Sequence, residues 1–152
     1  MIVWRIVRPV YAANPLSGIG AARRGSRWNS KGVRMAYAAT SRPLAVLEAL
    51  VHVGRDYLPL DAVLLPVEVP DSLVEQLGSP PSGWDELPFS QTARMAGDRW
   101  IAEGKSLGIL VPSAVLPLER NLLINPAHPG FCRIRLGTPE RDPFDRRLLG
   151  TA

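Results

Sequence analysis

The sequence predicts a single compact domain of the α+β class. Its 152 residues suit one hydrophobic core. Hydrophobic residues make up 46% of the chain, an ordinary value for a folded protein. Predicted strands and helices follow one another without the regular β-α-β alternation of a doubly wound sheet. We therefore expect residues 1–152 to form one α+β domain.

The first part of the chain contains two predicted strands separated by a loop. The hydrophobic pattern of residues 2–7 predicts a strand. Residues 14–20, with the sequence NPLSGIG, favour turns, and glycines punctuate the basic loop that follows. Residues 34–39 predict a second, short strand that carries Tyr37.

A helix is predicted next. It begins near Ser41, a suitable N-cap, with Pro43 in its first turn, and we expect it to end at Gly54. The helix is apolar nearly all round, which predicts that it is buried. The exceptions are Glu48 and His52, which lie four residues apart and therefore share one stripe of the helix.

The second half of the chain contains four predicted strands, two predicted helices and a proline-rich loop. The strands are expected over residues 61–69, 107–111, 121–125 and 131–136. The helices are expected over residues 71–77 and 90–104. Pro66 indicates an edge or a bulge in the first of these strands. The loop over residues 78–89, GSPPSGWDELPF, is expected to be a lid or a flank of a cleft.

The charges are unevenly distributed along the chain. The net charge is +4. Residues 1–55 contain nine basic side chains and a single acidic one, Glu48. Arginine dominates the basic residues, and its guanidinium is well shaped to bind phosphate. The basic ends could hold an anionic ligand together, or they could neutralise the acidic middle of the chain, and composition leaves both open.

Composition also excludes several classes of protein. Cys132 is the only cysteine, so no internal disulfide forms, and a reducing cytoplasm is expected. One cysteine and two histidines fall short of the usual zinc ligands, so no metal site is expected. The first ten residues lack the order of a signal peptide. Uncharged runs such as residues 106–118 are too short to span a bilayer, so no membrane association is expected.

The basic loop near residue 25 is the first candidate binding element. It matches neither the dinucleotide-binding fingerprint nor the phosphate-binding P-loop. Its glycines would still let the backbone approach a ligand closely, and Arg23, Arg24 and Arg27 could grip phosphate oxygens. On the loop alone, a surface turn with solvated arginines is the favoured alternative.

Glu48 is the strongest single candidate. Burying an unpaired carboxylate costs roughly several kcal/mol, so this residue either pairs with an arginine or faces a cleft. Tyr37 lies among small residues that leave room for a ligand, although half-buried tyrosines are common in strands. Ser113 follows an apolar strand and Pro112 but lacks the context of a hydrolase nucleophile, so a turn-capping role is its alternative.

Four further residues complete the set of candidates. Trp28 could anchor its loop in the core or stack on a ring, and Asn29 follows it directly. Asn125 and His128 belong to the rigid turn NPAHP. They could reach a site or merely hold the backbone.

The order and wording of these stretches resemble the RES domain family, named for an Arg, a Glu and a Ser. The matching stretches are GIGAARRGSRWNSKG, VRMAYAATSRPLAVLEAL, GDRWIAEGKSLGILVPSAV and NLLINPAHPGF, with FDRRL near the end. They spread over most of the chain. Ser26 departs from the family pattern, which usually has a second glycine there.

The resemblance implies a fold and a reaction. The fold would be similar to that of ADP-ribosyltransferases, a compact domain with a mixed, split β-sheet core and a cleft for NAD. The reaction would break the bond between nicotinamide and ribose, and ADP-ribose would pass to water, to phosphate or to a protein. NAD would be a substrate, and no permanently bound cofactor is expected.

The resemblance also implies a setting. Members are typically toxins of bacterial type II toxin–antitoxin pairs and act in the cytoplasm. The partner would be a separate antitoxin with an Xre-type helix-turn-helix that covers the active site. The pair would form a hetero-oligomer and would contact DNA only through the antitoxin.

The family's residues carry over onto matching positions. The resemblance implies that Arg27, Tyr37, Glu48 and Ser113 are catalytic. NAD would be held by Arg23, Arg24, Arg27, Trp28, Asn29, Tyr37, Asn125 and His128. Two other classes stay open: a ribonuclease-type toxin that uses Glu48 with His52, and an inactive module that only binds a partner.

Overall fold

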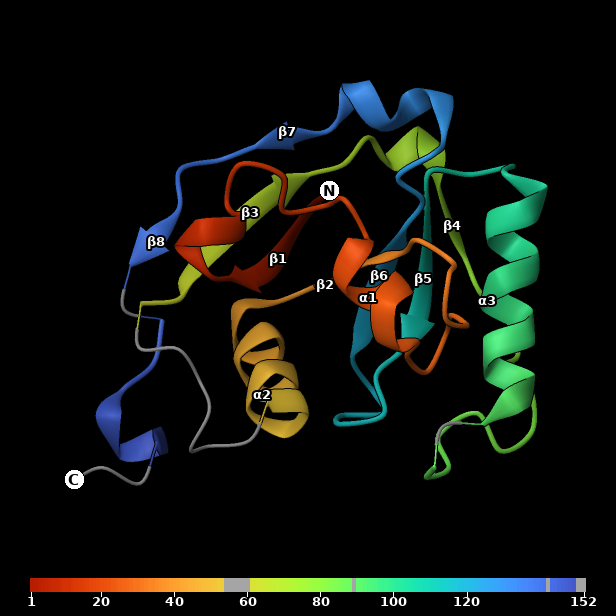
Figure 1. The fold of residues 1–152 in the computed structure, drawn as a ribbon, viewed down its shortest axis with the longest axis horizontal. Helices are drawn as coiled ribbons and strands as arrows, with labels where there is room; N and C mark the ends of the chain where they lie inside the picture. The colour runs from red at the N-terminus through yellow and green to blue at the C-terminus, as the bar shows by residue number, and fades with distance from the viewer. Residues whose placement is uncertain (54–60, 89, 142, 150–152) are drawn as a thin grey trace.

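The computed structural model describes residues 1–53, 61–88, 90–141 and 143–149. Its described strands form one curled, mixed sheet in the order β4-β5-β6-β2-β1-β3-β7, and β8 also pairs with β3 (Figure 1). The strands are β1 Ile2–Val7, β2 Ala36–Ala39, β3 Val63–Glu68, β4 Val74–Gln76, β5 Gly108–Pro112, β6 Arg120–Ile124, β7 Arg135–Leu136 and β8 Glu140–Arg141. Among these described pairings, β4 and β5 run parallel and the others are antiparallel.

Three α-helices and four short 3₁₀ helices lie around this sheet in the described parts of the chain. The α-helices are α1 Ile19–Arg24, α2 Arg42–Val53 and α3 Gln91–Glu103. The 3₁₀ helices are η1 Pro9–Tyr11, η3 Asp71–Leu73, η4 Pro129–Arg133 and η5 Arg146–Leu149. The predicted α+β class is therefore confirmed.

The sheet is nearly divided between β1 and β2. These two strands pair through a single register, Trp4 with Ala39, whereas β1 pairs with β3 at every residue from Ile2 to Val7. The core is divided in a related way. One apolar cluster includes Val3 and lies on the face away from α2 and α3, and separate clusters lie under α3 and under α2. Helices α2 and α3 thus cover the same face of a nearly split sheet.

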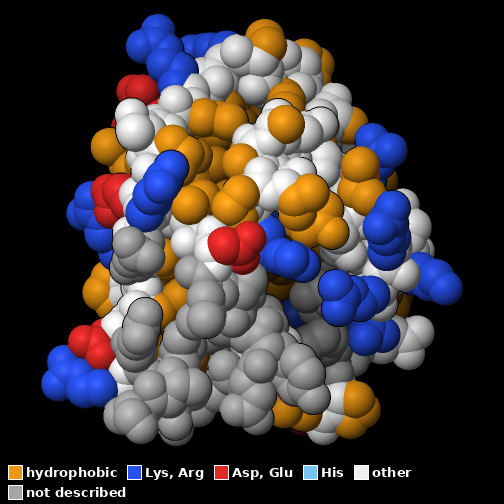
Figure 2. Space-filling model, turned by 60° about the vertical axis from the view of Figure 1, so that its left-hand side comes forward, with side chains coloured by type: hydrophobic (Ala, Val, Ile, Leu, Met, Phe, Trp, Pro, Cys, Tyr) orange, Lys and Arg blue, Asp and Glu red, His pale blue; other side chains and the backbone are white. Residues whose placement is uncertain are grey.

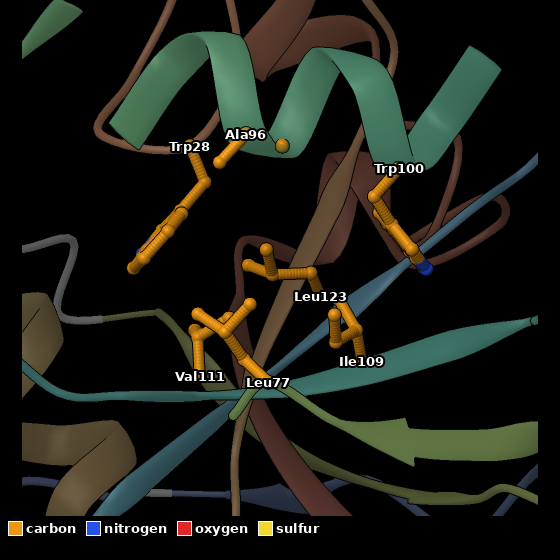
Figure 3. Close-up of a pocket in the computed structure, with 8 residues that line it drawn as sticks. Trp28, Leu77, Ala96, Trp100, Ile109, Val111 and Leu123 are labelled. Atoms are coloured by element: carbon orange, nitrogen blue, oxygen red, sulfur yellow. The ribbon is translucent and has the colours of Figure 1, made fainter. Parts of the chain in front are cut away.

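Helix α3 lies beside β5 and β6 over a small apolar cavity. The cavity is lined by Trp28, Leu77, Ala96, Gly97, Trp100, Ile109, Val111 and Leu123. Figure 3 shows their side chains directed toward one another beneath the helix. Gly97 permits this packing, because a Cβ there would lie 1.8 Å from the carbonyl oxygen of Trp28. The loop that carries Arg27 is thus pressed directly against α3.

Several expected elements are confirmed, with small shifts at their ends. Strands β1, β2, β3, β5 and β6 form where the hydrophobic pattern predicts them. Helix α2 begins after Ser41, whose Oγ accepts a hydrogen bond from Leu44 N–H at 3.4 Å. Helix α3 ends at Gly104, which adopts φ 58°. The predicted end of α2 at Gly54 lies outside the described residues, as does position 89 of the predicted loop.

Pro66 lies inside β3, which has neighbours on both sides. Its carbonyl oxygen accepts a hydrogen bond from Gly137 N–H at 2.9 Å, just beyond β7. Pairing of β3 with β7 covers Val67 and Glu68, and pairing with β8 covers Val63 and Leu64. Pro66, which has no backbone N–H, therefore lies between the part of β3 that pairs with β8 and the part that pairs with β7.

Four predictions about secondary structure are wrong. Residues 71–77 form η3 and β4 instead of a helix, because β4 completes the sheet by pairing with β5. Residues 131–133 belong to η4, which begins at Pro129. Only β7 remains of the predicted strand. The basic loop contains helix α1, bounded by Gly18 and Gly25 at positive φ. Finally, α2 is only half covered, since Val51 is 62% exposed.

Candidate functional site

The candidate site is built around the carboxylate of Glu48 on α2. Its Oε1 accepts hydrogen bonds from Ser113 Oγ at 2.8 Å and from Asn121 Nδ2. Its Oε2 lies 3.0 Å from His52 Nε2, one turn further along the same helix. The Glu48 side chain is 17% exposed. The carboxylate is therefore held on both oxygens and still reaches the surface.

Ser113 is completely buried and lies directly after β5. Its hydroxyl accepts hydrogen bonds from the backbone N–H groups of Val115 and Leu116, both at 3.1 Å. Since these two bonds occupy the acceptor positions of the oxygen, the single hydroxyl hydrogen is directed to Glu48. Ser113 is therefore a fixed donor to the carboxylate. Its place next to Glu48 agrees with the sequence-based grouping of the two residues.

Asn121 is a site residue that the sequence analysis did not select. It lies in β6, opposite Ala39 of β2 and Val111 of β5. Tyr37 of β2 pairs with Leu123, which lies two residues after Asn121 in β6. Asn121 and Tyr37 therefore lie on the same face of the sheet. The signal that marks it is a polar amide next to the apolar residues of β6, in the strand that pairs with β5, after which Ser113 follows.

The environment of Glu48 acts on its pKa in opposing directions. Burial raises the pKa, and hydrogen bonds from His52, Asn121 and Ser113 lower it by more, so the net pKa lies below the ordinary value. The carboxylate is therefore ionised at neutral pH. An ionised carboxyl has about four acceptor positions, and the three bonds above leave one open, on Oε2.

Tyr37 lies on β2 with its hydroxyl turned into the loop that contains Arg27. The hydroxyl donates a 2.7 Å hydrogen bond to Asn29 Oδ1. Burial raises the pKa of Tyr37 by more than the hydrogen bonds with the Ser26 side chain and the Trp28 backbone lower it. The hydroxyl therefore stays protonated at neutral pH. The Tyr37 ring links β2 to the loop.

Asn29 and Trp28 serve as internal supports. Asn29 is fully buried, and its Nδ2 donates to the carbonyl oxygens of Ala21, Ser30 and Val33. Trp28 is 3% exposed and stacks on Trp84 with a centroid distance of 5.8 Å. Both residues were predicted to bind the nucleotide. The structure gives both residues the anchoring role that the sequence left open for Trp28, since Asn29 bonds within its own loop and to Tyr37, and Trp28 packs in the core under α3. That they bind the nucleotide stays a prediction.

Arg27 is held between this loop and the proline-rich loop. Its Nη1 donates to the carbonyl oxygens of Trp84 at 2.7 Å and of Glu86 at 3.2 Å. Its guanidinium also lies 5.9 Å from the centroid of the Trp84 ring. Burial lowers the pKa of Arg27, and the negative charges of Asp85 and Glu48 oppose this effect. Arg27 therefore lies in the electrostatic neighbourhood of both Glu48 and Tyr37.

Asn125 and His128 are not brought to this site. Asn125 follows β6 at the end opposite Asn121, about 13 Å away at roughly 3.3 Å per residue. Its Oδ1 accepts from Ala127 N–H at 2.9 Å, and His128 Nδ1 accepts from Gly130 N–H at 2.9 Å. Both side chains therefore shape the turn before η4, away from Glu48, and their binding of the nucleotide stays a prediction.

Arg23 and Arg24 lie exposed in the last turn of α1. The described residues provide them with no ion-pair partner. Figure 2 shows Lys and Arg side chains grouped on the right of the view with no acidic side chain among them, and further ones on the left beside Asp or Glu. In the described parts of the chain, no cluster of three or more His, Cys, Asp or Glu side chains is placed to hold a metal ion.

The arrangement thus joins an ionised, partly accessible carboxylate with a half-buried arginine and a protonated tyrosine. A fixed negative charge stabilises a positive charge that develops beside it. Cationic side chains near the loop favour an anionic ligand. The geometry therefore suits a substrate that is anionic overall and that becomes locally positive as it reacts.

Comparison with known proteins shows the family and the fold. The sequence profile of the RES domain matches residues 2–145. The chain belongs to the RES domain family. Its fold is confirmed by a solved structure, the MbcT–MbcA toxin–antitoxin complex of Mycobacterium tuberculosis, at a TM-score of 0.73 and 20% identity. That match covers 98% of this chain and 86% of the other.

Two curated relatives are similar over nearly their whole lengths. The "Prs ADP-ribosylating toxin" of a Sphingobium species is 40% identical, with 98% of this chain and 97% of the relative covered. A "Toxin Res" of Pseudomonas putida is 41% identical, with 98% and 100% covered. Separately, none of the described helices combines the length and apolar character needed to cross a membrane.

Proposed function

We propose that this protein is the toxin of a bacterial toxin–antitoxin pair and that it consumes NAD by breaking the nicotinamide–ribose bond. The observation that carries the proposal is the ionised Glu48, held by Ser113, Asn121 and His52 beside Arg27 and Tyr37. The names of the relatives support it, since one is an ADP-ribosylating toxin and another a Res toxin.

Glu48 would stabilise the reacting ribose. When nicotinamide leaves, the electron pair of the broken bond stays on its ring nitrogen, and positive charge develops on the ribose. The Glu48 carboxylate would counter that charge and accept a hydrogen bond from a ribose hydroxyl on its open Oε2 position. Leaving nicotinamide is neutral, so the site needs no strong acid.

The arginines and Tyr37 would bind the rest of NAD. Its pyrophosphate is anionic, which suits Arg27, with Arg23 and Arg24 nearby in sequence on α1. The ring of Tyr37 would contact nicotinamide, since its hydroxyl is already bound to Asn29. NAD would act as substrate, with no permanently bound cofactor. The acceptor of ADP-ribose would be water, phosphate or a protein.

The toxin would be controlled by a second chain. The solved neighbour is a complex of a toxin with its antitoxin, which supports a protein partner here. We propose a separate antitoxin of the Xre type that covers the site, binds DNA on behalf of the pair and assembles with the toxin into a hetero-oligomer. The pair would act in the cytoplasm.

The proposal is tested by following NAD and nicotinamide over time with purified protein. Three conditions are compared: buffer alone, buffer with inorganic phosphate, and bacterial lysate with labelled NAD. We expect nicotinamide release by the wild type in at least one condition and none by Glu48→Gln, which keeps the size of the side chain and an oxygen that can accept from Ser113 and Asn121. Wild-type protein that leaves NAD intact in all three conditions, or Glu48→Gln with the wild-type rate, would refute it.

A further inference from the structure

His52 is the polar contact of Glu48 that the proposed reaction does not yet use. Its Nε2 lies 3.0 Å from Glu48 Oε2. Its side chain is 49% exposed, against 17% for Glu48. The imidazole is therefore the more accessible member of the pair, and an acceptor from solvent can reach it.

The contact fixes which nitrogen of the ring carries hydrogen. An ionised carboxylate only accepts hydrogen bonds, so Nε2 must be the donor in this pair. The other nitrogen of a neutral imidazole, Nδ1, then has a free lone pair. Among the described residues Nδ1 has no hydrogen-bond partner. A carboxylate that orients a histidine in this way is the arrangement by which enzymes prepare a general base.

The other side chains around Glu48 are unsuited to this task. Ser113 is fully buried and its hydrogen is directed to Glu48. The Tyr37 hydroxyl donates to Asn29, and Arg27 is a cation. Glu48 itself is the charge that stabilises the ribose. A second group is needed for an acceptor that arrives with a proton.

We propose that His52 is the general base of the reaction and that the acceptor is a protonated nucleophile, water or a protein hydroxyl. The acceptor oxygen bonds to the anomeric carbon as the carbon–nitrogen bond to nicotinamide breaks. The acceptor's proton passes to Nδ1 of His52, and the resulting imidazolium, stabilised by Glu48, returns the proton to solvent. This inference rests on the proposed NAD cleavage and assigns its second half.

The test compares His52→Gln and His52→Ala with the wild type. Gln keeps an N–H donor for Glu48 but has no basic nitrogen. Val51→Ala is the matched control, since Val51 is the preceding, exposed residue of α2. Nicotinamide release is measured with NAD in buffer, with lysate, and with sodium azide, an anion that has no proton to lose at neutral pH.

We expect His52→Gln to lower kcat by about 100-fold with water or lysate as acceptor, the size of a typical general-base contribution. The KM for NAD should stay within about twofold of wild type. When azide is the acceptor, His52→Gln should release nicotinamide at close to the rate of the wild type with azide. It should not restore Glu48→Gln, which lacks the stabilising charge. Val51→Ala should behave as wild type in every condition.

Three results would overturn the inference. Full activity of both His52 variants would remove His52 from the mechanism and leave NAD cleavage standing. Loss of activity that azide does not restore would make His52 a structural support of Glu48. A wild type that releases no nicotinamide in any condition would refute the proposed function, and the role of His52 with it.

Discussion

Ser113 Oγ lies 2.8 Å from Glu48 Oε1, although 65 residues separate them in the chain. The contact joins the turn after β5 to the middle of α2. Because two backbone N–H groups of that turn fix the hydroxyl, the position of the Glu48 charge is set by the sheet as well as by its own helix. The contact therefore ties stability and the proposed chemistry to one hydroxyl.

Ser113→Ala should lower both the stability of the fold and the rate of the proposed reaction. It removes the acceptor of the Val115 and Leu116 N–H groups and the donor to Glu48, and a hydrogen bond of this kind contributes about 0.5–1.5 kcal/mol net. It also removes one of the bonds that lower the pKa of Glu48. We expect a lower free energy of unfolding in urea and about a tenfold slower release of nicotinamide, equivalent to about 1.4 kcal/mol. Ser90→Ala, whose hydroxyl is exposed and contacts Thr92, is the control and should change neither.

The pH dependence of stability should report on Glu48. Because its pKa in the folded protein is lowered from 4.5, the charged form favours folding. That contribution is complete above the unfolded pKa and is lost as the pH falls through the folded pKa. The difference in unfolding free energy between wild type and Glu48→Gln should be constant near neutrality and shrink below about pH 4.5. A difference that stays constant to pH 3 would contradict the lowered pKa.

The sequence predicts the elements that carry the site better than those that surround it. Strand β2, helix α2 and strand β5 have clear hydrophobic patterns, so Tyr37, Glu48 and Ser113 could be placed on them. Their grouping came from the family resemblance, because no local pattern joins residues 65 positions apart. Helix α1 has only six residues and depends on flanking glycines, which a loop also contains.

Other residues could not be interpreted without the fold. Asn29 and Asn121 are both asparagines next to apolar or aromatic residues in the sequence. The structure buries Asn29 among three carbonyl groups and turns Asn121 toward Glu48. Which asparagine supports a loop and which meets a carboxylate depends on strand register, since a shift of one residue moves a side chain to the other face.

Trp84→Ala should impair the binding of NAD more than the chemical step. The Trp84 ring stacks on Trp28 and lies near the Arg27 guanidinium. Such aromatic contacts contribute about 0.5–1.5 kcal/mol. Without the ring, the loop that receives the Arg27 hydrogen bonds is less well fixed, so we expect the KM for NAD to rise about three- to tenfold. Leu87→Ala, 77% exposed in the same loop, is the control, and an equal effect of both variants would argue against a specific role for Trp84.

Gly97→Ala should test whether close packing of α3 positions the Arg27 loop. The new methyl group would lie 1.8 Å from the Trp28 carbonyl oxygen, so either the helix or the loop must move. Overpacking of a core typically costs about 1–3 kcal/mol, and we expect the upper end of that range in urea unfolding followed by tryptophan fluorescence.

Gly20→Ala is the matched control. A Cβ at Gly20 meets nothing within 4 Å, and alanine favours a helix over glycine by about 0.5–1 kcal/mol. If the folded fraction of Gly97→Ala also releases nicotinamide more slowly, α3 fixes the Arg27 loop for catalysis. A destabilised variant with the wild-type rate per folded molecule would confine Gly97 to a packing role.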